Sequence, residues 1–201
     1  MTQAGRLLVV CTANVCRSPL AQRVLQDRLP ALIESAGTRT EEGWSMCRVS
    51  ATELPDADHD GRFADAHRSR PVTRELVEGA ALVLTMEREQ RSAVARLAPG
   101  SQAKVFTLRE AAALAGVLRE RGAGAVPGLA ALAQALHSVR GFAPMPEPPK
   151  RRWFQRPAEP EDPLTIPDGH GLADDEHRAA VQQVRDTADR VAAAFSSLLA
   201  G

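Results

Sequence analysis

The sequence lacks the features that would tie it to a membrane, to nucleic acid or to a disulfide framework. Three cysteines among 201 residues are too few for a disulfide scaffold or for a zinc site made of cysteines alone. Lys plus Arg equals Asp plus Glu at 25 each, so no global field draws nucleic acid or anionic lipid. The apolar runs 7–10 and 80–84 are far too short to span a bilayer. We therefore expect a cytoplasmic protein with no membrane or nucleic-acid partner.

What the sequence does contain is a regular alternation of short apolar runs and helical stretches. The apolar content of 44% suits one domain with a hydrophobic core. The run 7–10 leads through a polar turn into a helical stretch at 19–29, and apolar residues at spacings of three and four indicate a last helix from about Asp174. This alternation predicts an α/β fold, a single-domain three-layer sandwich with a four-stranded parallel sheet and helices on both faces. The expected strands are Leu7–Val10, Ile33–Ala36, Ala81–Thr85 and Val105–Leu108.

Residues 110–161 depart from this alternation. Their first half is rich in Ala and Leu, which predicts helix. The stretch 142–163 is rich in proline, which is excluded from helix interiors and central strands. We therefore expect one domain over residues 1–201 with a helical and proline-rich insert at 110–161, the proline-rich half being an extended loop.

The segment from Val10 to Pro19 carries most of the chemical information. It places Cys11 and Arg17 six positions apart, between a strand and a helix. A loop at a helix N-terminus points backbone N–H groups inward, and the helix dipole favours an anion there. The same field, with Arg17, would stabilise the nucleophilic thiolate form of Cys11. Arg17 can also hold two phosphate oxygens at once. The pattern indicates phosphate chemistry without a metal.

Taken alone, the spacing also fits a simpler interpretation. Cys11 and Cys16 would then be small core residues beside a strand end, and Arg17 an ordinary surface arginine, because short motifs arise by chance. The sequence contains further stretches that decide between the two. The segment from Cys11 to Pro19, including Asn14, resembles the active-site loop of the low-molecular-weight protein tyrosine phosphatases. Four other stretches are similar to signatures of that family in the same order: Ser35–Thr38, His67–Arg70, Leu82–Met86 and Phe106–Arg109.

The resemblance implies an activity and its residues. A protein of this family hydrolyses phosphotyrosine in proteins through a phosphocysteine intermediate, with no metal and no cofactor. Cys11 would attack phosphorus, Arg17 would bind the phosphate, and Ser18 would donate a hydrogen bond to the thiolate. Asn14 and His67 would be a structural pair that holds the loop. The substrate-binding loop would comprise Thr12, Ala13, Asn14, Val15, Cys16 and Ser18, and the partner would be a phosphorylated protein, with a tyrosine kinase as one candidate.

The resemblance also implies an aspartic acid, usually followed by proline, before the last helix. It protonates the leaving oxygen and then acts as base for water. Asp162 keeps the following proline, whereas Asp168 keeps the family's distance to the final helix. Because spacing determines reach, we favour Asp168. Both residues are also typical of ordinary turns beside proline.

Two features depart from the family pattern. Ala13 stands where the family usually has glycine, which could alter the backbone angles of the loop. The chain also contains no tyrosine, whereas family members commonly wall the substrate pocket with tyrosines. Trp44 is the best aromatic replacement, with Leu172 and His170 as other candidates.

Three alternatives remain at this point. A thioredoxin-coupled arsenate reductase shares the fold and the loop, but it needs redox cysteines after the third strand, and this chain has none after Cys47. A protein-arginine phosphatase is also similar. Val15, which follows the loop asparagine, is apolar and so favours the tyrosine-directed members. The third alternative is a phosphate-binding module without turnover.

Overall fold

The computed structural model describes residues 5–55, 61–142 and 162–199. Its centre is a four-stranded sheet in the order β2-β1-β3-β4, and every neighbouring pair is parallel. The strands are β1 (Arg6–Cys11), β2 (Leu32–Gly37), β3 (Leu82–Thr85) and β4 (Val105–Thr107). Because all four strands run the same way, their carboxyl ends meet at one edge, where ligands bind in open α/β sheets.

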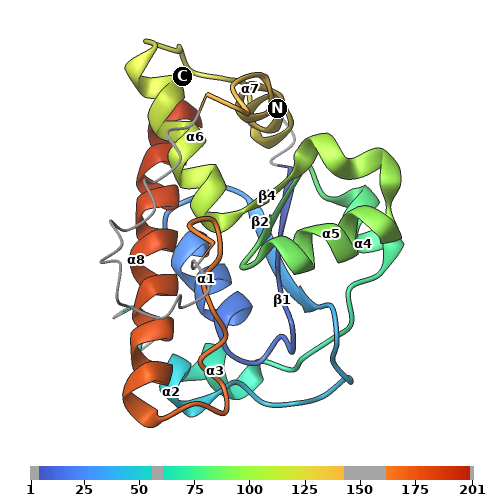
Figure 1. The fold of residues 1–201 in the computed structure, drawn as a ribbon, viewed down its shortest axis with the longest axis vertical. Coiled ribbons are helices and arrows are strands. Elements are labelled where there is room, and N and C mark those ends of the chain that lie inside the picture. The colour runs from blue at the N-terminus through green and yellow to red at the C-terminus, as the bar shows by residue number, and fades with distance from the viewer. Residues whose placement is uncertain (1–4, 56–60, 143–161, 200–201) are drawn as a thin grey trace, which may run out of the picture.

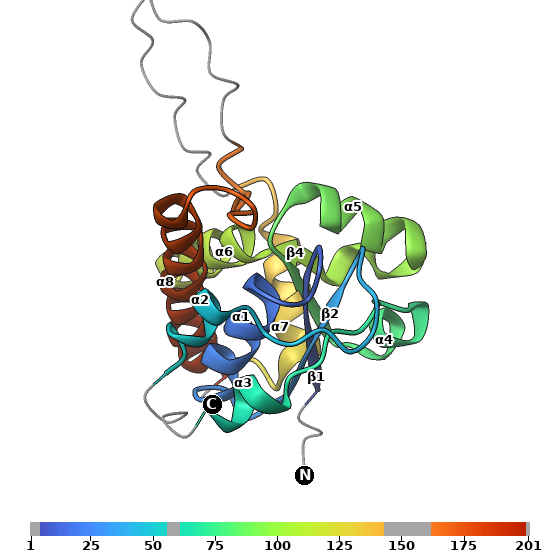
Figure 2. The ribbon, with the colours of Figure 1, turned by 90° about the horizontal axis from the view of Figure 1, so that it is seen from below.

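Helices cover both faces of the sheet (Figures 1 and 2). One face carries α4 (Arg74–Gly79) and α5 (Arg88–Leu97). The other carries α1 (Arg17–Gln26), α6 (Leu108–Glu120), α7 (Leu129–Ser138) and α8 (Asp174–Leu199). The remaining short helices are α2 (Arg48–Ala51), α3 (Arg62–Ala66) and the 3₁₀ helix η2 (Pro99–Lys104). The predicted three-layer α/β fold is confirmed.

The alternation of side chains along β1 explains why the sheet has a core on each face. Leu7 and Val9 are buried on the α1 and α8 side, whereas Leu8 and Val10 are buried on the α4 and α5 side. Successive strand residues point to opposite faces, so a strand buried on both sides must be apolar throughout. This is why a continuous apolar run, rather than an alternating one, marks β1 in the sequence.

The last helix supplies the largest covering element. The apolar residues that recur at spacings of three and four in this helix are all buried, and α8 packs against α1 and α6. That set comprises Val181, Val184, Ala188, Val191, Phe195 and Leu198. Within the part of the chain that the structure describes, no helix has the length and apolar character needed to cross a membrane.

Several predicted boundaries are shifted, for local reasons. The first helix begins at Arg17 rather than at Pro19, so proline occupies the first turn, where its missing N–H leaves no gap in the helix. The fourth strand ends at Thr107, because Thr107 caps α6 and exchanges reciprocal hydrogen bonds with Glu110. Of the predicted insert, residues 110–142 include most of α6 and all of α7, whereas 143–161 lie outside the described residues.

Candidate active site

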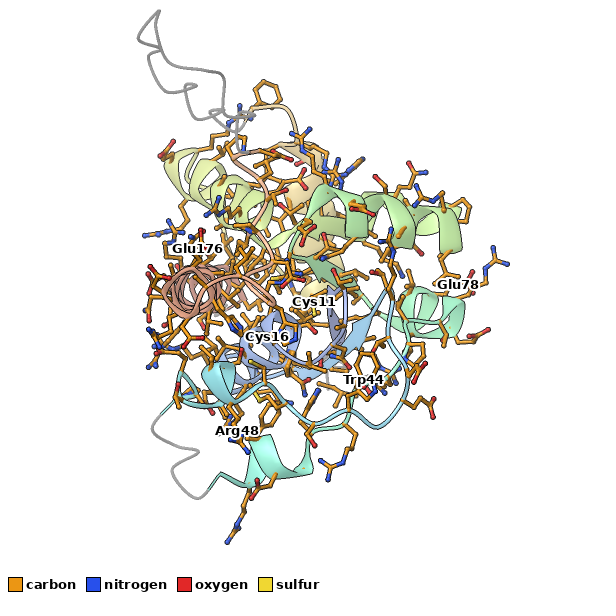
Figure 3. The ribbon with its side chains drawn as sticks, turned by 60° about the horizontal axis from the view of Figure 1, so that its bottom comes forward. Cys11, Cys16, Trp44, Arg48, Glu78 and Glu176 are labelled. Atoms are coloured by element: carbon orange, nitrogen blue, oxygen red, sulfur yellow. The ribbon has the colours of Figure 1, made fainter. Side chains whose placement is uncertain are left out.

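The loop between β1 and α1 lies at the carboxyl edge of the sheet. β1 ends at Cys11 and α1 begins at Arg17, so the predicted loop spans the turn from strand to helix. Thr12, Ala13 and Val15 are partly exposed, whereas the remaining loop residues are buried. In Figure 3, Cys11 and Cys16 lie between the sheet and the end of α8. The structure thus brings the predicted loop residues together in one turn.

The Cys11 thiol is held by two hydrogen-bond donors. Its Sγ lies 3.1 Å from the Ser18 hydroxyl and 3.2 Å from the backbone N–H of Asn14, and the residue is only 2% exposed. The Ser18 oxygen accepts a hydrogen bond from the Asn14 side-chain amide at 2.9 Å. The hydroxyl proton of Ser18 is therefore free to point at sulfur. Ser18 and Asn14 thus place two hydrogen-bond donors at the Cys11 sulfur.

Asn14 holds the loop in an unusual backbone conformation. Its φ of 54° makes it the one described non-glycine residue with positive φ. Asparagine tolerates this region better than most residues, but the conformation persists only where neighbours enforce it. Its side chain donates to Ser35 at 2.8 Å and accepts from the Arg70 N–H at 3.0 Å. His67 Nε2 donates to its carbonyl at 2.7 Å, and burial lowers the pKa of His67, which favours the neutral ring.

Arg17 lies behind the thiol and is almost fully buried, with 2% of its surface exposed. Nη1 donates to Glu87 and, at 3.0 Å, to the Ile166 carbonyl. Burial by itself would lower the pKa of Arg17, but the nearby charges of Cys11, Asp168 and Glu87 raise it. The guanidinium Nε has no hydrogen-bond partner among the described residues. A buried donor without a partner is rare in folded proteins and indicates a missing acceptor.

Glu87 and Gln90 are site residues that the sequence did not reveal. Both lie where β3 passes into α5, and Glu87 caps that helix through reciprocal bonds with Gln90. Gln90 Nε2 donates to the Thr12 hydroxyl at 3.1 Å, so the pair connects Arg17 to the loop. Their position after the third strand was the available signal, because polar residues after parallel strands meet at one edge.

The two candidate acids have different surroundings. Asp168 Oδ2 lies 2.7 Å from Arg17 Nη2, and its side chain is 41% exposed. Asp162 pairs instead with Arg88 Nε at 2.9 Å and accepts the Leu164 N–H within its own turn. Asp168 is thus at the loop and Asp162 is engaged elsewhere.

The Asp168 segment is anchored on both sides. The Ile166 N–H donates to the Met86 carbonyl at 2.9 Å, which fixes it beside the end of β3. On the other side, a Cβ on Gly169 would lie 2.7 Å from the Cα of His177 in α8. This close approach explains why glycine, and not the family's proline, follows the aspartate.

The side chain of Cys16 contacts other residues than that of Cys11 does. Cys16 precedes α1, is buried, and its Sγ lies 2.9 Å from the Ser50 hydroxyl. Contact with Cys47 raises the pKa of Cys16, and burial raises it further. The same contact lowers the pKa of Cys47 to about 5. Cys47, the more exposed sulfur, therefore carries the thiolate character of the pair.

The three side chains considered as replacements for the family's tyrosines in the substrate pocket are all exposed. Trp44 is 46% exposed, and its backbone bonds Ser69 through both its N–H and its carbonyl. Leu172 is exposed on the turn before α8, as is His170, which packs edge-on against His177.

The comparisons with known proteins agree with this geometry. Over 101 residues the chain is 36% identical to the low molecular weight protein-tyrosine-phosphatase Etp of Escherichia coli K12, a stretch that covers 50% of this chain and 66% of Etp. The structure of Wzb from Escherichia coli K30 with phosphate superposes with a TM-score of 0.59 at 20% identity, covering 95% of this chain and 98% of Wzb. The YwlE arginine phosphatase of Geobacillus stearothermophilus gives 0.59 at 23% identity, covering 94% and 91%.

The chain is thus an α/β protein with a parallel four-stranded sheet and a Cys-x5-Arg turn at the carboxyl edge of that sheet. The family model described as low molecular weight phosphotyrosine protein phosphatase matches residues 6–116, more than half of the chain. The chain belongs to that family.

Proposed function

We propose that the chain hydrolyses phosphate esters on proteins through a phosphocysteine at Cys11, and that phosphotyrosine is its substrate. The observation that carries this proposal is the state of Arg17. A buried guanidinium leaves Nε without a partner beside a buried thiol, and a phosphate oxygen would supply the acceptor that Nε lacks. A simple core arginine would have no reason to keep that donor unpaired.

The reaction would proceed in two displacements. The Cys11 thiolate attacks phosphorus while the P–O bond to the substrate breaks, and Asp168 gives its proton to the leaving oxygen. Asp168 then takes a proton from water, which attacks phosphorus, breaks the S–P bond and restores the thiolate. Arg17 and the loop N–H groups stabilise the charge on the phosphoryl oxygens in both steps.

Asp168 must leave Arg17 Nη2 for this to happen. Phosphate oxygens would replace the carboxylate on the guanidinium, since Arg17 presents Nε and Nη2 on one edge and phosphate matches that fork. The displaced carboxyl would then lie beside the leaving group. The Asp168 side chain is partly exposed, whereas the residues on either side of it are held in place. This arrangement would allow the carboxyl to move a short distance while its backbone stays fixed.

The choice of tyrosine over arginine rests on Val15 and on the relatives. Val15 presents an apolar, partly exposed side chain at the loop, which suits an aromatic ring better than a guanidinium. Etp is named a protein tyrosine phosphatase, whereas YwlE is named an arginine phosphatase. Trp44 would replace the missing tyrosines as an aromatic wall. The expected partner is a phosphoprotein, and a tyrosine kinase is one candidate.

The test is hydrolysis of three substrates by the wild type and by Cys11→Ser. We expect an aryl phosphate and a phosphotyrosine peptide to be hydrolysed, a phosphoarginine peptide to be hydrolysed much more slowly, and Cys11→Ser to be inactive but folded. A serine hydroxyl is a far weaker nucleophile than a thiolate. Arg17→Lys should lose nearly as much, because a point charge replaces the fork.

Trapping the intermediate by acid quench and mass spectrometry would locate the phosphate on Cys11. If the phosphoarginine peptide is hydrolysed faster than the phosphotyrosine peptide, the substrate is phosphoarginine and not phosphotyrosine. Thioredoxin-dependent reduction of arsenate, with no ester hydrolysis, would overturn the proposal altogether.

A further inference from the structure

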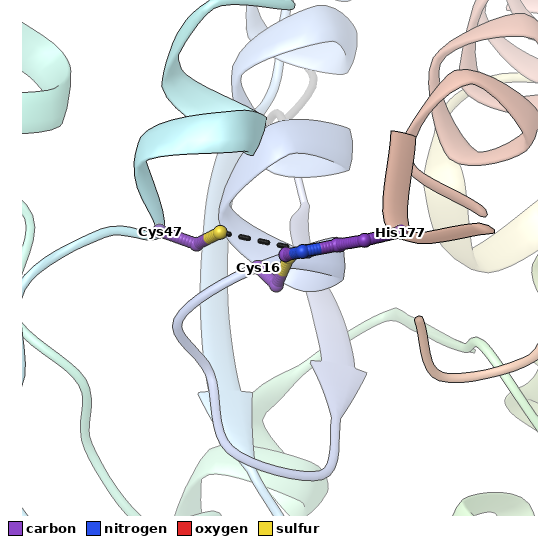
Figure 4. Close-up of side chains that lie close together, drawn as sticks. All are labelled: Cys16, Cys47 and His177. Atoms are coloured by element: carbon purple, nitrogen blue, oxygen red, sulfur yellow. Dashed lines mark hydrogen bonds between the residues drawn. The ribbon is translucent and has the colours of Figure 1, made fainter. Parts of the chain in front are cut away.

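Three side chains of types that can bind a metal ion lie close together next to the loop. Cys16 precedes α1, Cys47 precedes α2, and His177 lies in the first turn of α8. Their ligand atoms all lie within 4.8 Å of one another, and Figure 4 shows the three side chains converging. The His177 Nε2 lies 3.1 Å from the Cys16 sulfur and 3.6 Å from the Cys47 sulfur. None of the three is used in the reaction proposed above as an acid, base or nucleophile.

The distances match the edges of a tetrahedral zinc site. With Zn–S near 2.3 Å and Zn–N near 2.0–2.1 Å, tetrahedral angles place a sulfur and a nitrogen ligand about 3.5 Å apart. The two observed sulfur–nitrogen distances, 3.1 and 3.6 Å, lie on either side of that value. We propose that Cys16, Cys47 and His177 bind one zinc ion, with water as the fourth ligand.

The surroundings hold these side chains in place without a metal. The Cys47 N–H donates to the Val15 carbonyl at 2.7 Å, which ties the Cys47 segment to the loop. The Ser50 hydroxyl lies 2.9 Å from the Cys16 sulfur and can donate to it, as outer partners of metal-bound thiolates do. Gly169 packs directly on the His177 backbone, so the first turn of α8 cannot rotate freely.

The types and exposure of the ligands also suit zinc. Two thiolates and an imidazole form a common donor set for this ion, and three protein ligands with one water is its open form. His177 is 9% exposed and Cys16 is buried, whereas Cys47 is partly exposed and leaves a side for water and metal entry.

The bound ion would connect the phosphate loop to α2 and α8. It would also occupy the thiol of Cys16 while leaving Cys11 free, because Cys11 is not part of the cluster. The competing interpretation is a buried thiol pair that forms a Cys16–Cys47 disulfide. A disulfide would not need His177, whose Nε2 contacts both sulfurs.

The experiment uses the full chain, reduced and freed of metal. Zinc binding is measured by calorimetry and by competition with a chromophoric chelator, and cobalt(II) serves as a spectroscopic probe. We expect one zinc per chain, and a cobalt form with sulfur-to-metal charge-transfer absorption and the intense d–d bands of tetrahedral geometry. Cys47→Ser and His177→Asn should each weaken binding by more than the roughly 10–100-fold cost of losing an outer-shell partner.

Two control variants separate this site from others. Cys11→Ser should still bind one zinc, which would exclude the nucleophile as the ligand. His137→Asn, at an exposed histidine of α7, should bind as the wild type does. Circular dichroism of the metal-free variants checks that each is folded.

Three results would overturn the proposal: no charge-transfer absorption with cobalt, unchanged zinc affinity in both ligand variants, or loss of the zinc in Cys11→Ser. A protein that forms a Cys16–Cys47 disulfide in air and takes up no metal after reduction would establish the thiol-pair interpretation instead. Because metal binding is measured without substrate, failure here leaves the phosphatase proposal intact.

Discussion

Arg17 Nη2 and Asp168 Oδ2 lie 2.7 Å apart, although one residue begins the first long helix and the other precedes the last. The contact brings a carboxyl from the end of the chain to a loop near its beginning. Asp162, six positions earlier in a similar turn, makes no such contact and pairs with Arg88. The two aspartates can therefore be separated by mutation.

We predict that Asp168→Asn lowers kcat for a phosphotyrosine peptide by a factor on the order of 10² or more, as expected for loss of a positioned acid. Asp162→Asn should change kcat little, because it removes a half-exposed ion pair worth about 0–1 kcal/mol of stability. The loss in Asp168→Asn should shrink for aryl phosphates with good leaving groups. If Asp162→Asn is the more damaging change, the assignment of the acid is wrong.

A second prediction concerns Gly37, at the end of β2. A Cβ there would lie 2.7 Å from the Thr12 carbonyl oxygen and 2.8 Å from Thr40 Cγ2. Gly37→Ala should cost about 1–3 kcal/mol of unfolding free energy and, by displacing the loop, should lower kcat even where the protein is fully folded. Gly116 lies in α6, and a Cβ added there would meet no atom within 4 Å apart from its chain neighbours and the backbone of its own helix. Gly116→Ala should therefore stabilise the protein by about 0.5–1 kcal/mol. Urea unfolding and aryl phosphate kinetics on both variants check this, and a fully active Gly37→Ala would contradict it.

A third prediction follows from the pKa of His67, which burial lowers from its ordinary value of 6.5. The unfolded chain then binds a proton more readily than the folded chain. Stability from the neutral ring is fully present above about pH 6.5 and is lost as the pH falls below that value. The urea concentration at the midpoint of unfolding should fall between about pH 7 and 5, the range around the ordinary histidine pKa. The fall should be smaller in His67→Gln. His137→Asn is the matched control, and an equal drop in all three proteins would show that His67 does not contribute.

A fourth prediction concerns peroxide. In protein freed of metal, so that the Cys16 thiol is not bound to zinc, peroxide should oxidise the Cys11 thiolate to a sulfenic acid. Cys16 should then attack that sulfur and release water, which gives a Cys11–Cys16 disulfide. Thiol treatment should restore activity in the wild type but not in Cys16→Ser. Peptide mapping by mass spectrometry would identify the linked residues. Finding Cys11 linked to Cys47, or no link at all, would contradict this pairing.

The sequence was sufficient to predict the sheet and the loop, because both depend on local patterns. Four apolar runs in alternation with helices specify a parallel sheet, and Cys11 with Arg17 marks the turn after its first strand. The roles of Glu87 and Gln90 could not be predicted, because their contacts with Arg17 and Thr12 exist only after β3 has paired with β1. Nothing in a local pattern specifies such contacts.

The general acid and the cluster of Cys16, Cys47 and His177 could not be identified from local sequence patterns for the same reason. Both Asp162 and Asp168 satisfy a rule about nearby residues. The ion pairs that distinguish them, Asp168 with Arg17 and Asp162 with Arg88, exist only in the folded chain. Counting cysteines argued against a zinc site made of cysteine alone. It gave no indication that His177 would join Cys16 and Cys47, because three distant segments converge there.

The strained backbone at Asn14 also links ligand binding to the folding equilibrium. The bonds that hold it come from Ser35, His67 and Arg70, which lie on separate segments of the chain. An unfolded chain therefore has no oxyanion pocket, and an oxyanion that binds the loop binds the folded state alone. At a ligand concentration 100 times Kd, this selectivity would add about 2.7 kcal/mol to the free energy of unfolding. Free phosphate at that concentration would thus stabilise the fold of the whole chain, and not only the loop that it occupies.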